Sequence, residues 1–236
     1  MRLICFTCAG GTTDLFKDLK EELVKDMEVV LIDYSGHGKR YKESLYTDID
    51  SITGDLLNII DKESSLSQPY ALLGYSMGTI VTISIYEAIR KKGYKMPNHI
   101  FLAAHSPETS TEYLDFLSEA MEDKVKQYVI KFGGIAEQLW NNEAFWRVYL
   151  PIYQADFHAI GTYSFEERCP LINTPVSFFY SESDTPMQKM KGWNTYLRSG
   201  CDFYAYKGNH FFIKDHILEI SNVIRNTIGG NGYEII

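Results

Sequence analysis

Ser76 lies at the centre of the stretch that bears most directly on chemistry, Gly74-Tyr75-Ser76-Met77-Gly78. Apolar runs flank it at residues 70–73 and 79–85, and such runs are typical of a buried strand and a helix. A G-x-S-x-G sequence between a strand and a helix is the tight turn on which many hydrolases expose a nucleophilic serine. The glycines leave room for the backbone to fold back, and the helix N-terminus favours negative charge near the serine. The pattern predicts Ser76 as a nucleophile.

A serine hydroxyl needs a base to take its proton and an acid to orient that base. After such a turn the partners follow in the order acid, then histidine, each in a loop after a strand. Of the six histidines, His210 has this position, in a loop that follows a late apolar run. For the acid we favour Asp184, which lies four residues after the apolar run 176–180, with Glu182 as the alternative. A loop aspartate next to proline can also simply cap a helix.

The oxyanion that forms during acyl transfer needs two backbone N–H donors. Met77 follows the nucleophile and is expected to supply one, and Ala9 in the loop after the first strand is expected to supply the other. We expect no metal and no cofactor, because the four cysteines lack the spacing of metal ligands and acyl transfer to a serine and then to water requires neither. Cys5 and Cys8 are interpreted as structural residues of a reduced protein.

Short apolar runs that alternate with longer amphipathic segments predict how these residues are positioned. We expect strands at residues 3–7, 29–33, 70–75, 100–104, 176–180 and 202–206. We expect helices at residues 13–25, 48–60, 77–91, 187–198 and 212–224. The alternation predicts an α/β fold with a mostly parallel central sheet and helices on both faces. Ligands of such folds bind at the carboxyl ends of the strands, where Ser76, Asp184 and His210 would meet.

Residues 106–170 interrupt the alternation with helical patterning and no predicted strand. We interpret this segment as a helical lid inserted into a single domain that spans residues 1–236; a subdomain that only adds core is the alternative. Its aromatic residues could line an acyl channel or form the core of the lid itself. The glycine-rich tail at residues 229–232 is expected to be frayed.

Composition narrows the class of partner. The chain has 236 residues with a net charge of −8, which disfavours nucleic-acid binding. It has no apolar run of the roughly 20 residues that a membrane span needs, and its first residues lack the features of a signal peptide. We expect a cytoplasmic protein, and a monomer.

Taken together, the motifs resemble those of the type II thioesterases that accompany non-ribosomal peptide and polyketide synthases. The resemblance is carried, in chain order, by Phe6-Thr7-Cys8-Ala9-Gly10-Gly11, Ser35-Gly36-His37-Gly38, the Ser76 pentapeptide, Gly133-Gly134-Ile135-Ala136-Glu137-Gln138-Leu139, Leu150-Pro151-Ile152-Tyr153-Gln154-Ala155-Asp156-Phe157, Asp184, Trp193 and Gly208-Asn209-His210-Phe211-Phe212. Thr7, Tyr75 and Asn209 depart from the family's proline, histidine and glycine, and none of these departures removes a reacting group.

The resemblance implies an α/β-hydrolase that cleaves acyl thioesters from the phosphopantetheine arm of acyl or peptidyl carrier proteins, either to clear stalled or mis-primed carriers or to release products. The partner would be a transiently bound carrier domain, and the phosphopantetheine belongs to the substrate. A carboxylesterase or lipase acting on oxygen esters is the alternative, and a binding protein without activity is a further one. Carriers are commonly acidic, so Lys39, Arg40 and Lys42 are candidates for docking, although they could equally form a solvated loop.

Overall fold

The computed structural model of the protein describes residues 1–62 and 66–229. Its centre is a sheet of six strands in the order β2-β1-β3-β4-β5-β6, and every neighbouring pair is parallel. The strands are β1 (Arg2–Phe6), β2 (Glu28–Leu31), β3 (Tyr70–Tyr75), β4 (His99–Ala103), β5 (Val176–Ser181) and β6 (Cys201–Tyr206). The predicted α/β class is confirmed, and all six predicted strands are present, with small shifts at their ends.

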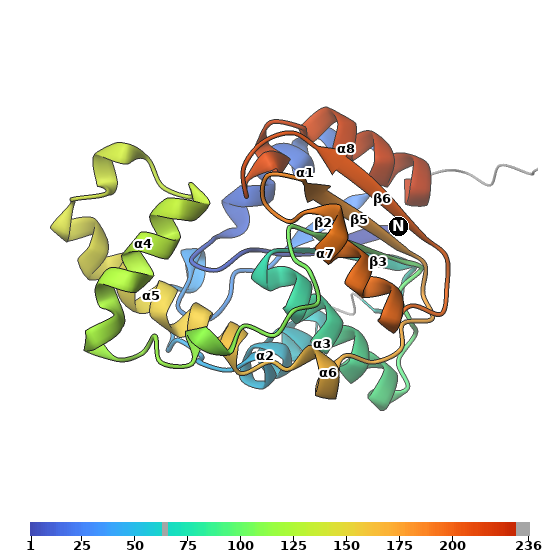
Figure 1. Ribbon diagram of the computed structural model, residues 1–236. Helices are drawn as coiled ribbons and strands as arrows, with labels where there is room; N and C mark the ends of the chain where they lie inside the picture. The colour runs from blue at the N-terminus through green and yellow to red at the C-terminus, as the bar shows by residue number, and fades with distance from the viewer. Residues whose placement is uncertain (63–65, 230–236) are drawn as a thin grey trace, which may run out of the picture.

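Helices cover both faces of the sheet (Figure 1). One face carries α1 (Lys17–Leu23) and α8 (Ile217–Ile224), and the other carries α2 (Ile49–Lys62) and α3 (Met77–Lys92). Because the sheet is covered on both sides, its central strands are continuous apolar runs, and all six residues of β3 are buried.

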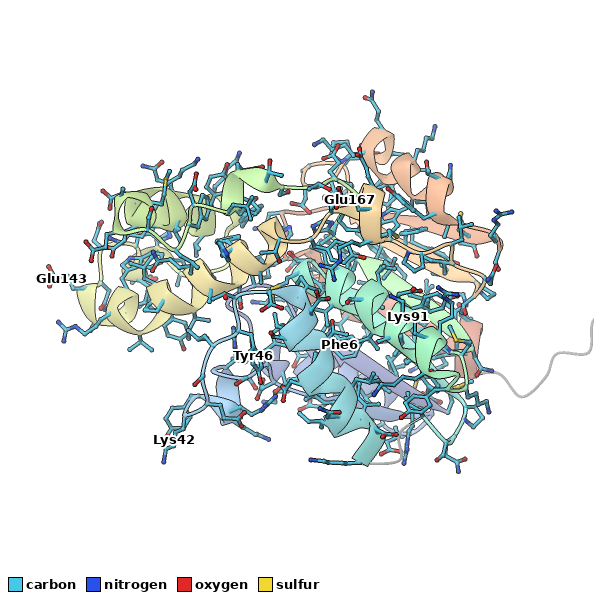
Figure 2. All side chains as sticks on the ribbon, turned by 90° about the horizontal axis from the view of Figure 1, so that it is seen from below. Phe6, Lys42, Tyr46, Lys91, Glu143 and Glu167 are labelled. Atoms are coloured by element: carbon cyan, nitrogen blue, oxygen red, sulfur yellow. The ribbon has the colours of Figure 1, made fainter. Side chains whose placement is uncertain are left out.

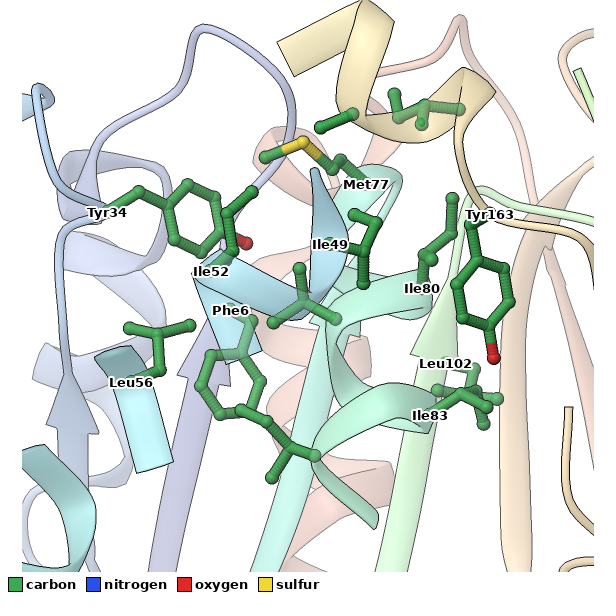
Figure 3. Packing of buried hydrophobic residues seen from close by; sticks show 14 of the residues in the cluster. Phe6, Tyr34, Ile49, Ile52, Leu56, Met77, Ile80, Ile83, Leu102 and Tyr163 are labelled. Carbon is green, nitrogen blue, oxygen red and sulfur yellow. The ribbon is translucent and has the colours of Figure 1, made fainter. Parts of the chain in front are cut away.

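The core consists of two clusters separated by the sheet. Alternate side chains of β1 point to opposite faces, so Leu3 and Cys5 join the cluster under α1 and α8, whereas Ile4 and Phe6 join the cluster under α2 and α3. Figure 3 shows the second cluster, with Phe6 among residues from α2 and α3. The strand that ends in the loop of Ala9 is therefore held from both sides.

Residues 106–170, all of which the structure describes, form helices and turns and contain no strand. The main elements are α4 (Glu122–Phe132), α5 (Glu143–Gly161) and α6 (Phe165–Arg168). In Figure 1, α4 and α5 extend from one end of the sheet, and Figure 2 shows Glu143 at the far end of this segment. Aromatic rings pack against one another inside it, such as Phe116 with Tyr128 at 5.6 Å between centroids. We call residues 106–170 the insertion.

Three predicted helices differ from those in the structure. The predicted helix 13–25 begins with a 3-10 turn, Thr13–Phe16, ahead of α1. The predicted helix 187–198 is a short α7 (Met187–Met190) followed by a 3-10 segment, Lys191–Tyr196. The predicted helix 212–224 is a 3-10 turn, Phe212–Lys214, separated from α8. The part of the predicted frayed tail beyond residue 229 lies outside the described residues.

Candidate active site

Ser76 occupies a strained turn between β3 and α3. Its backbone has φ 55° and ψ −119°, a conformation that non-glycine residues rarely adopt. A Cβ on Gly74 would lie 2.2 Å from the carbonyl oxygen of Gly78, and one on Gly78 would lie 2.0 Å from that of Phe6. Backbone atoms cannot move aside cheaply, so both positions require glycine. The turn predicted from the sequence is present, with Ser76 at its apex.

The structure brings together the three side chains predicted from separate parts of the sequence. His210 Nε2 lies 2.8 Å from Ser76 Oγ, and His210 Nδ1 lies 2.9 Å from Asp184 Oδ1. The second carboxylate oxygen of Asp184 accepts a hydrogen bond from the Thr185 hydroxyl at 3.0 Å. The alternative acid, Glu182, instead accepts weakly from the backbone N–H of Met187 at 3.3 and 3.4 Å. The geometry therefore supports Asp184 over Glu182 as the acid.

Side chains at the ends of two strands, β3 and β5, hold the loop that carries His210. The hydroxyl of Tyr75, a fully buried residue at the end of β3, donates to the carbonyl oxygen of His210 at 2.6 Å. The hydroxyl of Ser181, at the end of β5, donates to the carbonyl oxygen of Gly208 at 2.5 Å. The imidazole is thus positioned through its own main chain as well as through Asp184.

The insertion also contacts this loop. The Phe132 ring lies 4.9 Å from the imidazole of His210, between centroids. A Cβ on Gly134 would lie 2.8 Å from the Phe211 ring, and one on Gly133 would lie 2.9 Å from the side-chain nitrogen of Asn209. The paired glycines of the insertion therefore let the chain pass close to the histidine loop.

A cavity of about 270 Å³ opens beside Ser76. Its wall combines residues from the strand ends with residues of the insertion: Cys8, Ala9, Ala104, His105, Tyr113, Val129, Phe132, Tyr153, Phe157, Ile160, Asp184 and His210. The sequence left open whether the aromatic residues of the insertion line a channel or form the insertion's own core. Tyr113 does both, because it packs against Phe116 and also lines the cavity. The insertion also contributes polar residues to the wall, Ser106, Glu108, Ser110 and Glu112, so an acyl chain would lie against the part formed by its apolar and aromatic side chains.

The two predicted N–H donors belong to the segments that follow two neighbouring strands, β3 and β1. Met77 is the first residue of α3, so its N–H has no partner within the helix. Ala9 follows β1 and lines the same cavity as Ser76. Both amides therefore belong to segments next to the serine.

A buried histidine–aspartate pair lies behind the Ala9 loop, and the sequence alone assigned it no role. His37 Nε2 lies 2.9 Å from Asp156 Oδ2, and the two side chains are only 3% and 2% exposed. Burial alone would lower the pKa of His37, but the charge and hydrogen bond of Asp156, with the Ser35 carbonyl, outweigh it and leave that pKa raised. Both residues lie in stretches that carry the family resemblance, and this was the available signal.

A second serine–histidine contact lies elsewhere in the sheet. His99 Nε2 is 2.9 Å from Ser177 Oγ, and both residues are buried near the starts of β4 and β5. Because the strands are parallel, this contact is at the opposite end of the sheet from Ser76. Neither residue lines the cavity beside Ser76, so we interpret the contact as part of the core.

The basic residues considered for docking are not equivalent. Arg40 is held by ion pairs to Asp55, at 2.6 Å, and to Glu43, and its side chain is only 18% exposed. Lys39 and Lys42 are exposed, and Figure 2 shows Lys42 extending away from the body of the molecule. Arg40 therefore supports the loop, which leaves Lys39 and Lys42 as the residues of this group available to a partner.

Within residues 1–62 and 66–229, no group of three or more histidine, cysteine, aspartate or glutamate residues is arranged to hold a metal ion. In the same part of the chain, no helix has the length and apolar character that crossing a bilayer requires. The four cysteines are free thiols, and burial raises the pKa of Cys8 to about 11, so this thiol in the cavity wall is protonated at neutral pH.

A parallel sheet with helices on both faces, and a serine on a strained turn at the end of its third strand, define an α/β-hydrolase of the serine hydrolase type. The thioesterase domain family matches residues 1–227, and the chain belongs to this family.

The comparisons include both curated relatives and solved structures. The medium-chain S-acyl fatty acid synthase thioesterase of Rattus norvegicus is 28% identical over 235 residues, which cover 96% of this chain and 86% of that protein. The gramicidin S biosynthesis protein GrsT of Aneurinibacillus migulanus is 25% identical, and the match covers 93% of this chain and 86% of that protein. The structure of the type II thioesterase BorB from the borrelidin biosynthetic cluster superposes with a TM-score of 0.81 at 23% identity. The superposition covers 96% of this chain and 91% of that chain. The last similarity bears on the fold alone.

Proposed function

We propose that the protein hydrolyses acyl thioesters carried on the phosphopantetheine arm of carrier proteins, through an acyl-enzyme on Ser76. The observation that carries this proposal is the chain of hydrogen bonds from Ser76 through His210 to Asp184, which opens into an acyl-sized cavity in a member of the thioesterase domain family.

In the first half of the reaction, His210 Nε2 takes the proton of Ser76 Oγ as that oxygen attacks the thioester carbonyl. The carbon–sulfur bond then breaks, and the thiolate of the pantetheine arm receives the proton from His210. In the second half, His210 takes a proton from water, and the water oxygen attacks the acyl-serine. The carboxylic acid leaves, and Ser76 Oγ recovers its proton. Asp184 stabilises the imidazolium that forms in both halves.

The N–H groups of Met77 and Ala9 stabilise the oxyanion of each tetrahedral intermediate. This stabilisation is greatest in a site that excludes water, since competing solvent dipoles are then absent. The apolar side chains that the insertion places in the cavity wall provide such surroundings.

We propose further that the insertion acts as a lid on a single hydrolase domain. It supplies much of the cavity wall and contacts the His210 loop through Phe132 and Gly134, so its displacement would open a path for the pantetheine arm. Hydrogen exchange with and without acyl-pantetheine tests this. Faster exchange in α4 than in β3, slowed by the ligand, is expected; exchange as slow as in β3 and insensitive to the ligand would indicate a fixed cover.

Carrier-bound thioesters are the expected substrates because the folded carrier offers binding energy remote from the reacting carbonyl. The sequence relatives support this assignment, since GrsT is named for gramicidin S biosynthesis. The test compares kcat/KM for an acetyl-carrier, acetyl-CoA and p-nitrophenyl acetate. A preference for the carrier is expected, and faster turnover of the oxygen ester would favour the esterase alternative.

The exposed pair Lys39 and Lys42 is the proposed contact for an acidic carrier. Reversal of both charges to glutamate should raise KM for the acetyl-carrier and leave acetyl-CoA hydrolysis nearly unchanged. Equal losses on both substrates would mean that the change damages the neighbouring active-site loop, and no loss on either would place docking elsewhere.

A further inference from the structure

Asp156 connects three segments that lie far apart in the sequence. It comes from α5 of the insertion, and its Oδ2 accepts a hydrogen bond from the backbone N–H of Gly10 at 2.6 Å. The same oxygen lies 2.9 Å from Nε2 of His37, in the loop after β2. One carboxylate therefore joins the insertion to the loop after β1 and to the loop after β2.

The protonation of His37 follows from its neighbours. Its Nδ1 lies 3.0 Å from the carbonyl oxygen of Ser35, and a carbonyl oxygen can only accept a hydrogen bond. Its Nε2 faces the carboxylate of Asp156. Both ring nitrogens face acceptors, so both donate, and His37 is an imidazolium paired with a buried carboxylate. The positive charge compensates Asp156 and leaves it able to accept from Gly10.

The contact with Gly10 lies one peptide away from the proposed oxyanion donor. The N–H that Asp156 holds belongs to the peptide between Ala9 and Gly10, so it fixes the orientation of that plane. Tyr153, one turn earlier on α5, closes the other side, because a Cβ on Gly10 would lie 2.0 Å from its ring. Gly10 has φ +64°, which suits glycine and helps the loop bend under Tyr153.

We propose that Asp156 is a positioning residue for the oxyanion donor Ala9, so that the insertion, through α5, sets the geometry of the acyl-transfer site. The inference rests on the proposed function, in which Ala9 contacts the oxyanion and Asp156 acts only through the Ala9–Gly10 peptide. Removing the Asp156 carboxylate should therefore weaken binding of the transition state more than binding of the substrate.

The experiment compares Asp156→Asn with Asp50→Asn. The control variant breaks an ion pair between Asp50 of α2 and Arg168, at the end of the insertion and on the protein surface. Reactive serine sites are first counted by complete labelling with a fluorophosphonate, so that misfolded protein does not enter the rates. The kcat per labelled site and the KM are then measured with acetyl-CoA and with p-nitrophenyl acetate.

For Asp156→Asn we expect kcat per site to fall about 10- to 100-fold, less than or close to the loss of a whole oxyanion donor, with KM changed less than about threefold. Inhibition by a trifluoromethyl ketone, which forms an oxyanion adduct on the serine, should weaken by a similar factor. Asp50→Asn should match the parent protein in all three measurements. A kcat per site within twofold of the parent for Asp156→Asn, or an equal loss in Asp50→Asn, would overturn the proposal.

The two substrates separate this inference from the proposed function. An oxyanion forms on either ester, so a positioning role predicts the same loss with p-nitrophenyl acetate even if carrier thioesters prove to be poor substrates. If Asp156→Asn does not fold, the double variant His37→Gln/Asp156→Asn, which removes both charges of the buried pair together, takes its place with the same expected loss. An unchanged kcat per site in that variant would equally overturn the proposal.

Discussion

Replacing Tyr75 by phenylalanine tests whether the main chain of the histidine loop positions the base. The change removes one oxygen atom from a fully buried side chain, and with it the hydrogen bond of 2.6 Å to the carbonyl oxygen of His210. Tyr70→Phe is a matched control, because the hydroxyl of Tyr70 donates to the carbonyl oxygen of Lys95 at 2.5 Å, from the other end of the same strand.

Tyr75→Phe leaves a buried carbonyl oxygen without its donor, which costs about 1–3 kcal/mol of unfolding free energy, and Tyr70→Phe should cost less because the carbonyl oxygen of Lys95 is only partly buried. For a domain of this size that corresponds to a lower Tm by about 2–4 °C per kcal/mol. The two variants should differ in activity. A loss of about 1.4 kcal/mol of transition-state stabilisation through a looser His210 lowers kcat about tenfold, and Tyr75→Phe is expected to show a loss of this order. Tyr70→Phe should keep the parent kcat.

The assay combines thermal unfolding with steady-state hydrolysis of acetyl-CoA, normalised to serine sites labelled by a fluorophosphonate. A lower Tm in both variants with a selective fall of kcat in Tyr75→Phe is the expected result. If both variants lose stability and neither loses kcat, then Asp184 alone suffices to hold the imidazole, and the reasoning about the Tyr75 hydroxyl is refuted.

Two further predictions concern the acid of the site and the pH dependence of stability. Asp184→Asn should lower kcat by about 10²- to 10⁴-fold and Glu182→Gln by less than about threefold, and a greater loss in Glu182→Gln would reverse the assignment. The pKa of His37 is raised, so its stabilising pair with Asp156 is fully formed below pH 6.5 and is lost as the pH rises through the raised pKa. Burial lowers the pKa values of His99 and His105 from 6.5 to about 4. Between these pH values the unfolded chain binds protons at the two histidines that the folded chain does not. The free energy of unfolding therefore falls as the pH falls from 6.5 towards 4, by up to about 3 kcal/mol for each histidine. Urea unfolding should therefore give a maximum of stability near pH 6.5, and a monotonic rise of stability from pH 4 to pH 8 would contradict the raised pKa of His37.

The sequence predicted those features whose signal is local. The residues of β3 are apolar throughout because both faces of the sheet are covered, and its predicted bounds agree with the structure. The turn at Ser76 was recognisable because backbone atoms lie against Gly74 and Gly78 and exclude other residues. Asp184 and His210 were found because each lies in a loop that follows a short apolar run, and such runs predict buried strands.

The features that the sequence missed depend on distant contacts. The second half of the predicted helix 187–198 is a 3-10 segment in the structure. This segment contains Gly192, where the chain passes close to Pro107. The predicted helix 212–224 is interrupted at His216, whose backbone is not helical (φ −127°, ψ 31°) and whose Nε2 lies 2.9 Å from the carbonyl oxygen of Lys207. Asp156 and His37 are 119 residues apart in the sequence, and neither alone indicates a partner.

The most direct test of the account is rapid quenching of the protein with an acetyl-carrier, followed by mass spectrometry of the intact protein and its peptides. An increase of one acetyl group on the peptide that contains Ser76, together with release of the free carrier thiol, is the expected result. The adduct should be absent in Ser76→Ala, with activity reduced by about 10³-fold or more. An acetyl group on a different residue, or a Ser76→Ala protein that still clears the carrier at the parent rate, would contradict the account.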